Sequence, residues 1–335
     1  METIKLKIKP LSSFKSKLQS DTIFGMFCWM YKYLYGEEDF VSTLKDYDKS
    51  PFIIFSDGFL EDTLPRPVVK PENIDIVESI VHQYTDDIEI RYSLLKKIKN
   101  ISSLDIEEIQ GFLNDNPVKE NSIINAILQS MFDRKGNLIH AKSNKKFIEH
   151  NILKNSVNRI LNTTTEGLYV SHEYYINSNI EIYVKFDDLK ISIERIKEIF
   201  EAIGKTGFGA DKSTGKGRFE IIEIFEEFDI KDNLLPAKNQ EKNGFVSLSS
   251  GLLLDDSVTL NFGKTFTKFG KLGGDKAISG NHFKNPIILF KAGSTFFIKE
   301  HKEFYGNATN KVFADQQGFH SGFMIPLFLN LEKEV

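Results

Sequence analysis

The stretch IGKTGFGADKSTGKGRFEI, residues 203–221, joins a helical pattern to a strand-like pattern through a run of glycines and lysines. The strand-like run that follows the glycines is Arg218-Phe219-Glu220-Ile221, and the apolar residues before them recur at the helical period: Ile196, Ile199, Phe200 and Ile203. A phosphate-binding loop, G-x-x-x-x-G-K-[ST], runs instead from strand to helix, because phosphates bind at a helix N-terminus. Ile199 also stands where the first glycine of that pattern is required. The sequence therefore predicts a glycine-rich loop from helix to strand, and no ATP-binding P-loop.

The segments before this loop predict a ferredoxin-like βαββαβ order. We expect a helix that begins with Ser20 as N-cap and ends at Gly36. A second helix is expected over 192–203, and a weakly apolar insertion of short helices from about 72 to 155. The expected strands cover residues 3–9, 51–60, 167–176, 179–186 and 218–228.

A charged stretch, 229–243, separates a second unit that is rich in glycine and lysine. The fold class is therefore predicted as α+β with two ferredoxin-like (RRM-like) domains, the second irregular and degenerate. The expected domains are residues 1–228, including the insertion, and 244–335.

The composition excludes several function classes. Of 335 residues only Cys28 is a cysteine, which allows no internal disulfide and fits a cytoplasmic protein. No apolar run reaches the roughly 18 residues of a membrane span, and we expect no membrane association. The formal net charge of −4 is unevenly distributed, with basic residues gathered in 133–159 and 261–299.

The sequence shows no grouping of histidine, cysteine or carboxylate residues with metal-ligand spacing, so no metal or cofactor is expected. His282 and His320 lie in glycine-containing loops, where either could contact RNA or act in acid–base catalysis. The pair Asp187-Asp188 lies between a strand and a helix, where it is most simply a helix-start signal.

The glycine-rich loop is the strongest candidate site. Glycines at 207, 209, 215 and 217 allow positive φ and close approach of the backbone to a ligand. Four cations, Lys205, Lys212, Lys216 and Arg218, suit phosphates, and Phe208 offers a face for base stacking. The stretch 261–284 repeats this chemistry and contributes Lys271 and Lys276. Basic and aromatic residues in alternation are typical of proteins that bind single-stranded RNA.

Four stretches resemble a known family. LQSDTIFGMFCWMY (18–31), NSVNRILNTTTEGLYVSHEYY (155–175), GKTGFGADKSTGKGRFEI (204–221) and GFHSGFMIPLFL (318–329) are similar to segments of RAMP-superfamily CRISPR proteins. Within that superfamily the resemblance is to the subunits that bind the 5′ tag of the guide RNA in type III-A (Csm) effector complexes, the fourth in the Csm series. Gln19 departs from the pattern, since relatives often have histidine there.

The resemblance implies a non-catalytic, RNA-binding subunit in antiviral defence. It implies contacts with the 5′ tag of the guide RNA, with the large polymerase-like subunit and with the first backbone subunit, and indirect contact with target RNA. The residues it places near RNA are Ser20, Asp21, Asn158, Arg159, Lys205, Gly207, Phe208, Gly209, Lys212, Ser213, Gly215, Lys216 and Arg218. It also implies a thumb-like hairpin, for which FDRKGNLIHAKSNKKF (132–147) is the candidate, with Arg134, Lys135, His140 and Lys142.

Two alternatives remain open at this point. One is a metal-independent endoribonuclease that matures guide RNA, with His282, His320 or Tyr174 and a lysine as its acid–base groups. The other is a protein-interaction module without an RNA role, which the net negative charge favours.

Overall fold

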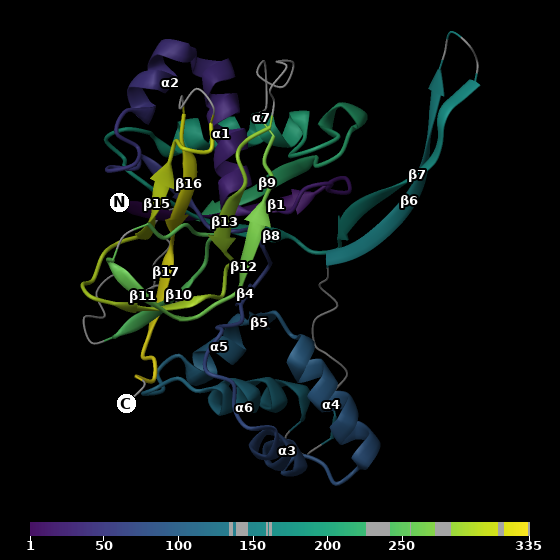
Figure 1. The fold of residues 1–335 in the computed structure, drawn as a ribbon, viewed down its shortest axis with the longest axis vertical. Coiled ribbons are helices and arrows are strands. Elements are labelled where there is room, and N and C mark those ends of the chain that lie inside the picture. Colours follow the sequence, from purple (N-terminus) through teal and green to yellow (C-terminus); the bar gives the residue numbers. More distant parts are fainter. Residues whose placement is uncertain are drawn as a thin grey trace.

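The computed structural model describes residues 1–133, 137–138, 147–158, 160, 163–225, 242–254, 256–271, 283–313 and 318–333. Figure 1 shows three parts: a helix-covered sheet near the N-terminus, a second β-rich part, and a helical insertion at the opposite end. A long hairpin projects from one side. None of the helices in the described ranges is long and apolar enough to cross a membrane.

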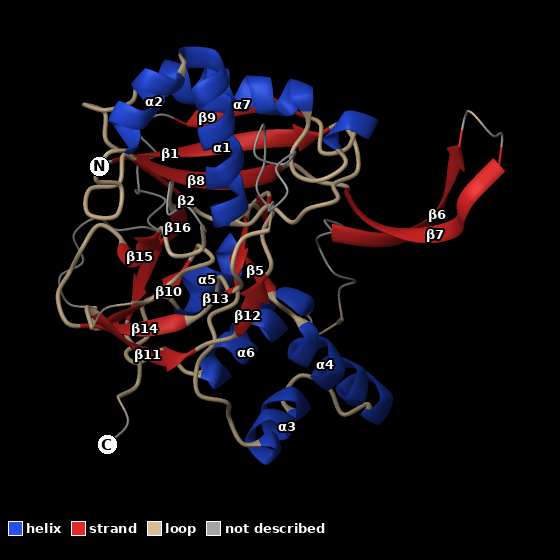
Figure 2. Ribbon diagram, turned by 45° about the horizontal axis from the view of Figure 1, so that its top comes forward, coloured by secondary structure: helices blue, strands red, loops and turns tan. Residues whose placement is uncertain are grey.

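The first sheet has the predicted ferredoxin-like topology. Its strand order is β2 (Ile53–Phe55), β8 (Ile180–Phe186), β1 (Glu2–Pro10) and β9 (Phe219–Phe225), and all neighbours are antiparallel. A short strand, β3 (Phe59–Leu60), also pairs with β8. Figure 2 shows α1 (Ser20–Tyr35) and α7 (Ile193–Thr206) over one face of this sheet.

Both predicted helices form, and their ends differ from the expectation. Gln19, and not Ser20, is the N-cap of α1, and Asp57 Oδ1 accepts a hydrogen bond from Ser20 N at 2.8 Å. Gly36 ends α1 at a φ of 92°, as predicted, and α2 (Glu37–Leu44) follows. Helix α7 continues through Gly204, where a Cβ atom would lie 2.4 Å from the carbonyl oxygen of Phe219. Glycine therefore serves here to pack α7 onto β9.

The second unit has the strand order of the first sheet without its helices. Strands β11 (Val258–Phe262), β14 (Thr295–Ile298), β10 (Gly244–Ser247) and β17 (Pro326–Leu329) are adjacent in that order and antiparallel. Within the described part of 242–333 no helix is present. Two antiparallel strand pairs lengthen the connections: β12 (Thr265–Lys268) with β13 (Ile287–Phe290) between β11 and β14, and β15 (Tyr305–Thr309) with β16 (His320–Met324) between β14 and β17, where the first unit has α7. The predicted α+β class with an irregular second ferredoxin-like unit is thereby confirmed.

The two units share a hydrophobic core. Ile4 and Ile182 of the first sheet belong to the same buried cluster as Leu248 and Ile325 of the second unit. Strand β16 contacts both α1 and β2. The expected division into domains at 228 and 244 stays a prediction, since most of the segment between these positions lies outside the described residues.

The insertion is helical only in its first part. It contains α3 (Ile74–His82), α4 (Ile88–Asn100), α5 (Ile106–Phe112) and α6 (Glu120–Met131), and a short pair, β4 (Thr63–Pro65) with β5 (Ser103–Asp105), lies at its base. The expectation of helices up to residue 155 is wrong. Residues 147–158 form a strand, β6 (Phe147–Asn158), paired along its length with β7 (Thr163–Ile176). Strand β6 makes its backbone hydrogen bonds with β7, and the local sequence of β6 does not reveal that it has this partner strand.

Candidate nucleic-acid interface

Three segments that are distant in sequence meet at the glycine-rich loop. Residues 11–19 run between the loop and the base of the β6–β7 hairpin. Gly217 N donates to Ser13 O at 2.8 Å, and Leu11 N donates to Arg218 O at 2.8 Å. On the other side, Phe14 and Tyr174 exchange two backbone hydrogen bonds, of 2.9 and 2.7 Å. The loop and the hairpin are thus attached to opposite edges of one short connector.

The glycines of the loop serve mainly its own packing. A Cβ atom would lie 2.3 Å from Lys216 O at Gly207, 2.5 Å from the Ser16 side chain at Gly209, and 2.2 Å from Phe208 O at Gly217. All three glycines have positive φ. The packing of the loop therefore requires glycine at these three positions, and their approach to a ligand stays a prediction. Gly215, with a φ of 83° and nothing within 4 Å of a built Cβ, is the exception among the four.

Phe208 is not a stacking surface in this structure. Its side chain is 2% exposed, and its ring packs against Phe14 with centroids 6.2 Å apart. Phe208 N also donates to Gly217 O at 2.8 Å, which closes the loop on itself. The predicted aromatic contact with a base is corrected to a core contact that anchors the loop.

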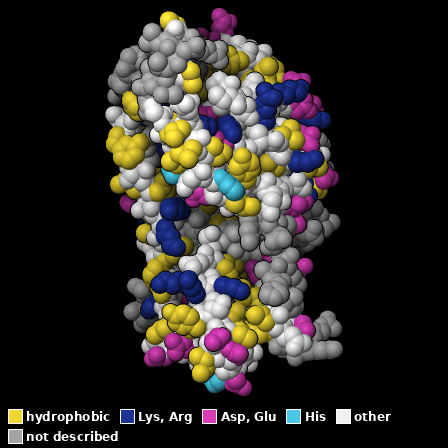
Figure 3. Space-filling view, turned by 90° about the vertical axis from the view of Figure 1, so that its right-hand side faces the viewer, with side chains coloured by type: hydrophobic (Ala, Val, Ile, Leu, Met, Phe, Trp, Pro, Cys, Tyr) yellow, Lys and Arg dark blue, Asp and Glu magenta, His cyan; other side chains and the backbone are white. Residues whose placement is uncertain are grey.

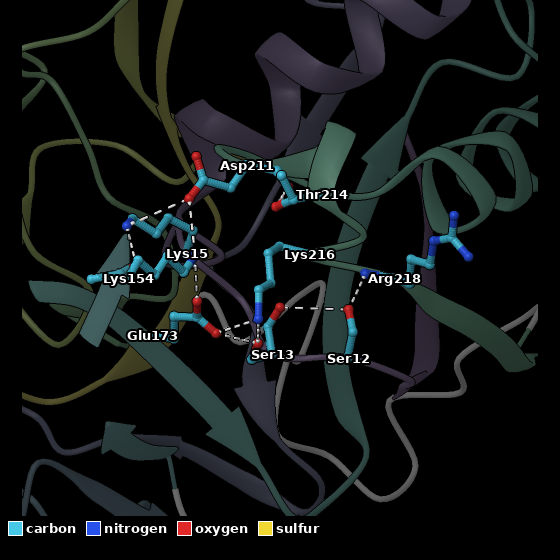
Figure 4. A network of polar contacts seen from close by, with 10 residues as sticks. Ser12, Ser13, Lys15, Lys154, Glu173, Asp211, Thr214, Lys216 and Arg218 are labelled. Carbon is cyan, nitrogen blue, oxygen red and sulfur yellow. Dashed lines mark hydrogen bonds and ion pairs between the residues drawn. The ribbon is translucent and has the colours of Figure 1, made fainter. Parts of the chain in front are cut away.

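Lys216 is held by a buried carboxylate (Figure 4). Its Nζ atom lies 2.5 Å from Glu173 Oε2 and 2.9 Å from Ser13 Oγ. Lys154 of β6 approaches Glu173 Oε1 at 2.9 Å, and the Ser13 hydroxyl donates to Oε2 at 2.6 Å. Burial alone would raise the pKa of Glu173, but the hydrogen bonds from Lys216, Ser13 and Lys154 outweigh it and lower this pKa to about 2. Lys216, predicted as an RNA contact, is part of this ionic anchor, and its contact with RNA stays a prediction.

The remaining cations of the loop stay exposed. Lys205, Lys212 and Arg218 are exposed, as is Ser213 at the tip. Two further cations come from the connector and were missed by the sequence analysis. Lys15 Nζ donates to Ser171 Oγ at 2.6 Å, and Lys17 lies over the Tyr174 ring, 5.6 Å from its centroid. The alternation of lysines in SSFKSKLQ was the available signal for these two.

Figure 3 shows the side of the molecule that is on the right in Figure 1, where the hairpin projects. Lys and Arg side chains occur at several places on this face, among hydrophobic and acidic ones. Cations beside apolar faces suit single-stranded nucleic acid, whose backbone needs positive charge and whose bases need apolar contacts.

Ser20 and Asp21, predicted near RNA, are buried at the junction of the two units. The Ser20 hydroxyl donates to Ser250 O at 3.0 Å. Asp21 Oδ2 lies 2.5 Å from Lys268 Nζ and 3.6 Å from His320 Nε2. These contacts join α1 to β12 and β16 of the second unit. Both residues therefore support the packing that holds the two units together.

His320 is also buried, which bears on the endoribonuclease alternative. Burial lowers its pKa to about 4, against the opposing effect of Asp21. An imidazole with this pKa is neutral at pH 7 and sits away from solvent. His282, the other histidine proposed for catalysis, lies outside the described residues.

Of the remaining predicted residues, the structure describes Asn158, Lys271 and Asp187 and not six others. Asn158 pairs with Thr163 at the far end of β6, and Lys271 Nζ lies 5.1 Å from the Phe283 ring centroid. Asp187 caps a turn before α7, with Leu189 N donating to its carboxylate at 3.2 Å. The residues that lie outside the described ones are Arg134, Lys135, His140, Lys142, Arg159 and Lys276. The thumb candidate at 132–147 stays a prediction, and the projecting hairpin begins where it ends.

In the described ranges no group of three His, Cys, Asp or Glu residues is arranged to hold a metal ion.

Comparison with known proteins gives similarity in structure only. No protein-family model and no curated protein matches the chain. The structure is similar to a chain from the crystal structure of a Csm1-Csm4 cassette in complex with AMPPNP. The TM-score is 0.58 at 14% sequence identity, and the similarity covers 100% of each of the two chains. The structure is also similar to a chain from a Csm3-Csm4 subcomplex of the type III-A CRISPR-Cas interference complex, with a TM-score of 0.55 at 19% identity and 99% and 100% of the two chains covered. The chain therefore has the same fold as these chains from Csm1-Csm4 and Csm3-Csm4 structures.

Proposed function

We propose that the protein is the Csm4-like subunit of a type III-A (Csm) CRISPR effector complex and binds the repeat-derived 5′ tag of the guide RNA. The observation that carries this proposal is the full-length likeness to chains from Csm1-Csm4 and Csm3-Csm4 structures. The exposed cations on the glycine-rich loop and connector support an RNA-binding role.

The proposed partners follow from the same likeness. The similar chains were solved with Csm1 or with Csm3, so the counterparts here are the large polymerase-like subunit and the first backbone subunit. Contact with target RNA is indirect, through the guide. The exposed lysines and Arg218 bind phosphates of the guide, and the role is that of a non-catalytic scaffold in the cytoplasm.

The test is to purify the affinity-tagged protein from its native host and to sequence the 5′ ends of the RNA that comes with it. A single 5′ end derived from a CRISPR repeat supports tag binding, while random or absent RNA contradicts it. Mass spectrometry of the same sample tests for the two partner subunits. Incubation of the protein with repeat RNA in EDTA distinguishes this function from the endoribonuclease alternative, which predicts a discrete cleavage product. The burial of His320 gives that alternative no support.

A further inference from the structure

Two carboxylates face the lysines at the base of the hairpin, and they are held very differently. Glu173 is buried and makes direct contacts of 2.5 to 2.9 Å. The Asp211 side chain, at the tip of the glycine-rich loop, is 41% exposed. Its Oδ2 atom lies 3.5 Å from Lys15 Nζ and 3.7 Å from Lys154 Nζ. Both distances exceed the 2.7–3.2 Å that is usual for a hydrogen bond, so Asp211 forms only a loose ion pair.

The two lysines are each fixed on one side and accessible on the other. Lys15 Nζ is anchored by Ser171 Oγ of β7, and Lys154 Nζ is anchored by Glu173 Oε1. Their side chains are 27% and 25% exposed. Both amino groups converge on the same Asp211 oxygen, as Figure 4 shows. Two positioned ammonium groups around one loosely held anionic oxygen are an arrangement that a phosphate can occupy, since a phosphate accepts several charge-assisted hydrogen bonds.

The backbone at Asp211 brings its carboxylate to this position. Its φ is 58° and its ψ is 21°, in the left-handed region that non-glycine residues other than Asn and Asp rarely adopt. The turn that follows closes with Thr214 N donating to Asp211 O at 3.0 Å. Asp211 is the one acidic residue in the loop 207–218, and its carboxylate lies near two cations contributed by other segments.

We propose that Lys15 and Lys154 form a binding site for one backbone phosphate of RNA, and that the Asp211 carboxylate occupies this site until RNA displaces it. The inference rests on the proposed RNA-binding function. The phosphate replaces Asp211 between the connector and the hairpin, while Glu173 keeps Lys154 and Lys216 in place. Asp211 therefore lowers the affinity for RNA, and the bound strand passes across the base of the hairpin.

The test uses the full chain and a fluorescein-labelled single-stranded RNA oligonucleotide, with affinity measured by fluorescence anisotropy at several salt concentrations. Asp211→Asn removes the charge and keeps a residue that tolerates the left-handed conformation. We expect it to tighten binding about five-fold, the effect of one unit charge about 4 Å away in a largely solvated site. Asp211→Gly should do the same, which guards against a folding defect of the Asn variant.

The matched control is Asp188→Asn, the same charge change at the other end of the 14-residue helix α7. That helix is about 21 Å long, well beyond the Debye length of about 8 Å at physiological ionic strength, so this variant should bind like the wild type. Lys15→Met should weaken binding and lower the salt slope by about 0.7, the value for one phosphate contact with a single strand. In the Lys15→Met background, Asp211→Asn should lose most of its gain, because the two residues act on one site.

Three results overturn the inference. If the wild type binds RNA but Asp211→Asn behaves like Asp188→Asn, Asp211 does not occupy a phosphate site, and the proposed RNA-binding function stands. If Asp211→Asn tightens binding equally with and without Lys15, the effect is one of general charge and not of this site. If the wild type binds no RNA, both the inference and the proposed function fail.

Discussion

Replacement of Glu173 by glutamine tests whether the buried carboxylate joins the glycine-rich loop to the hairpin. Glu173→Gln keeps the shape of the side chain and removes the charge that Lys216 and Lys154 share at 2.5 and 2.9 Å. Breaking a buried ion pair by removing one partner costs about 3–5 kcal/mol. The two lysines are 20% and 25% exposed and can recover part of their hydration. We therefore expect the free energy of unfolding to fall by about 2–3 kcal/mol at pH 7.

The pH dependence of this loss has a defined sign. The pKa of Glu173 is lowered from its ordinary value of 4.5 to about 2 in the folded protein. Its contribution to stability is fully present above pH 4.5 and is lost as the pH falls toward 2, because the unfolded chain takes up the proton first. One pKa unit corresponds to about 1.4 kcal/mol, so the difference between wild type and variant should shrink by about 1.4 kcal/mol between pH 7 and pH 3.5.

The assay is urea unfolding of the full chain, followed by intrinsic fluorescence from pH 7 to pH 3.5. Glu220→Gln is the matched control, since Glu220 forms an exposed ion pair with Lys9 at 3.2 Å and should change stability by no more than about 1 kcal/mol. An equal loss for the two variants, or a difference for Glu173→Gln that does not depend on pH, would refute the role of Glu173 as a buried anchor.

Three further predictions concern the loop. Gly217→Ala should destabilise the fold by about 1–3 kcal/mol more than Gly215→Ala, because both positions have positive φ but only Gly217 faces the Phe208 carbonyl oxygen, 2.2 Å from a built Cβ; equal melting temperatures would contradict this. Phe208→Ala should lower the free energy of unfolding by about 3–5 kcal/mol as a core truncation, whereas a stable variant that has lost RNA affinity would restore the stacking role. The double variant Lys212→Ala with Arg218→Ala should leave stability within about 0.5 kcal/mol of the wild type. Its salt slope for RNA binding should fall by about 1.4, for two phosphate contacts with a single strand, and an unchanged slope would remove these residues from the interface.

Much of the first sheet could be predicted from the sequence, because its signals are local. The alternation of Ile4, Leu6 and Ile8 in β1 and the helical spacing of Ile196, Ile199 and Ile203 in α7 each lie within one element. Strand β6 was missed because its hydrogen bonds depend on its register with β7.

The roles within the candidate site could not be predicted in the same way. Sequence analysis selected Lys216 and Phe208 as RNA contacts from their residue types. The structure pairs Lys216 with Glu173 of β7 and packs Phe208 on Phe14 of the connector, both far away in the chain. Lys15, which the structure brings beside Asp211, was not selected.

The sequence by itself determined most helices and strands of the first sheet and the place of the glycine-rich loop, since periodicity, glycine positions and caps act over a few residues. The tertiary structure alone decided which cations of the loop remain exposed. A lysine is neutralised or left accessible according to the carboxylate that folding places beside it, and the carboxylate of Glu173 reaches Lys216 across 43 residues of chain. Burial and pairing of charge are properties of segments that meet in space, and for that reason Lys212 and Arg218 stay exposed while Lys216 does not.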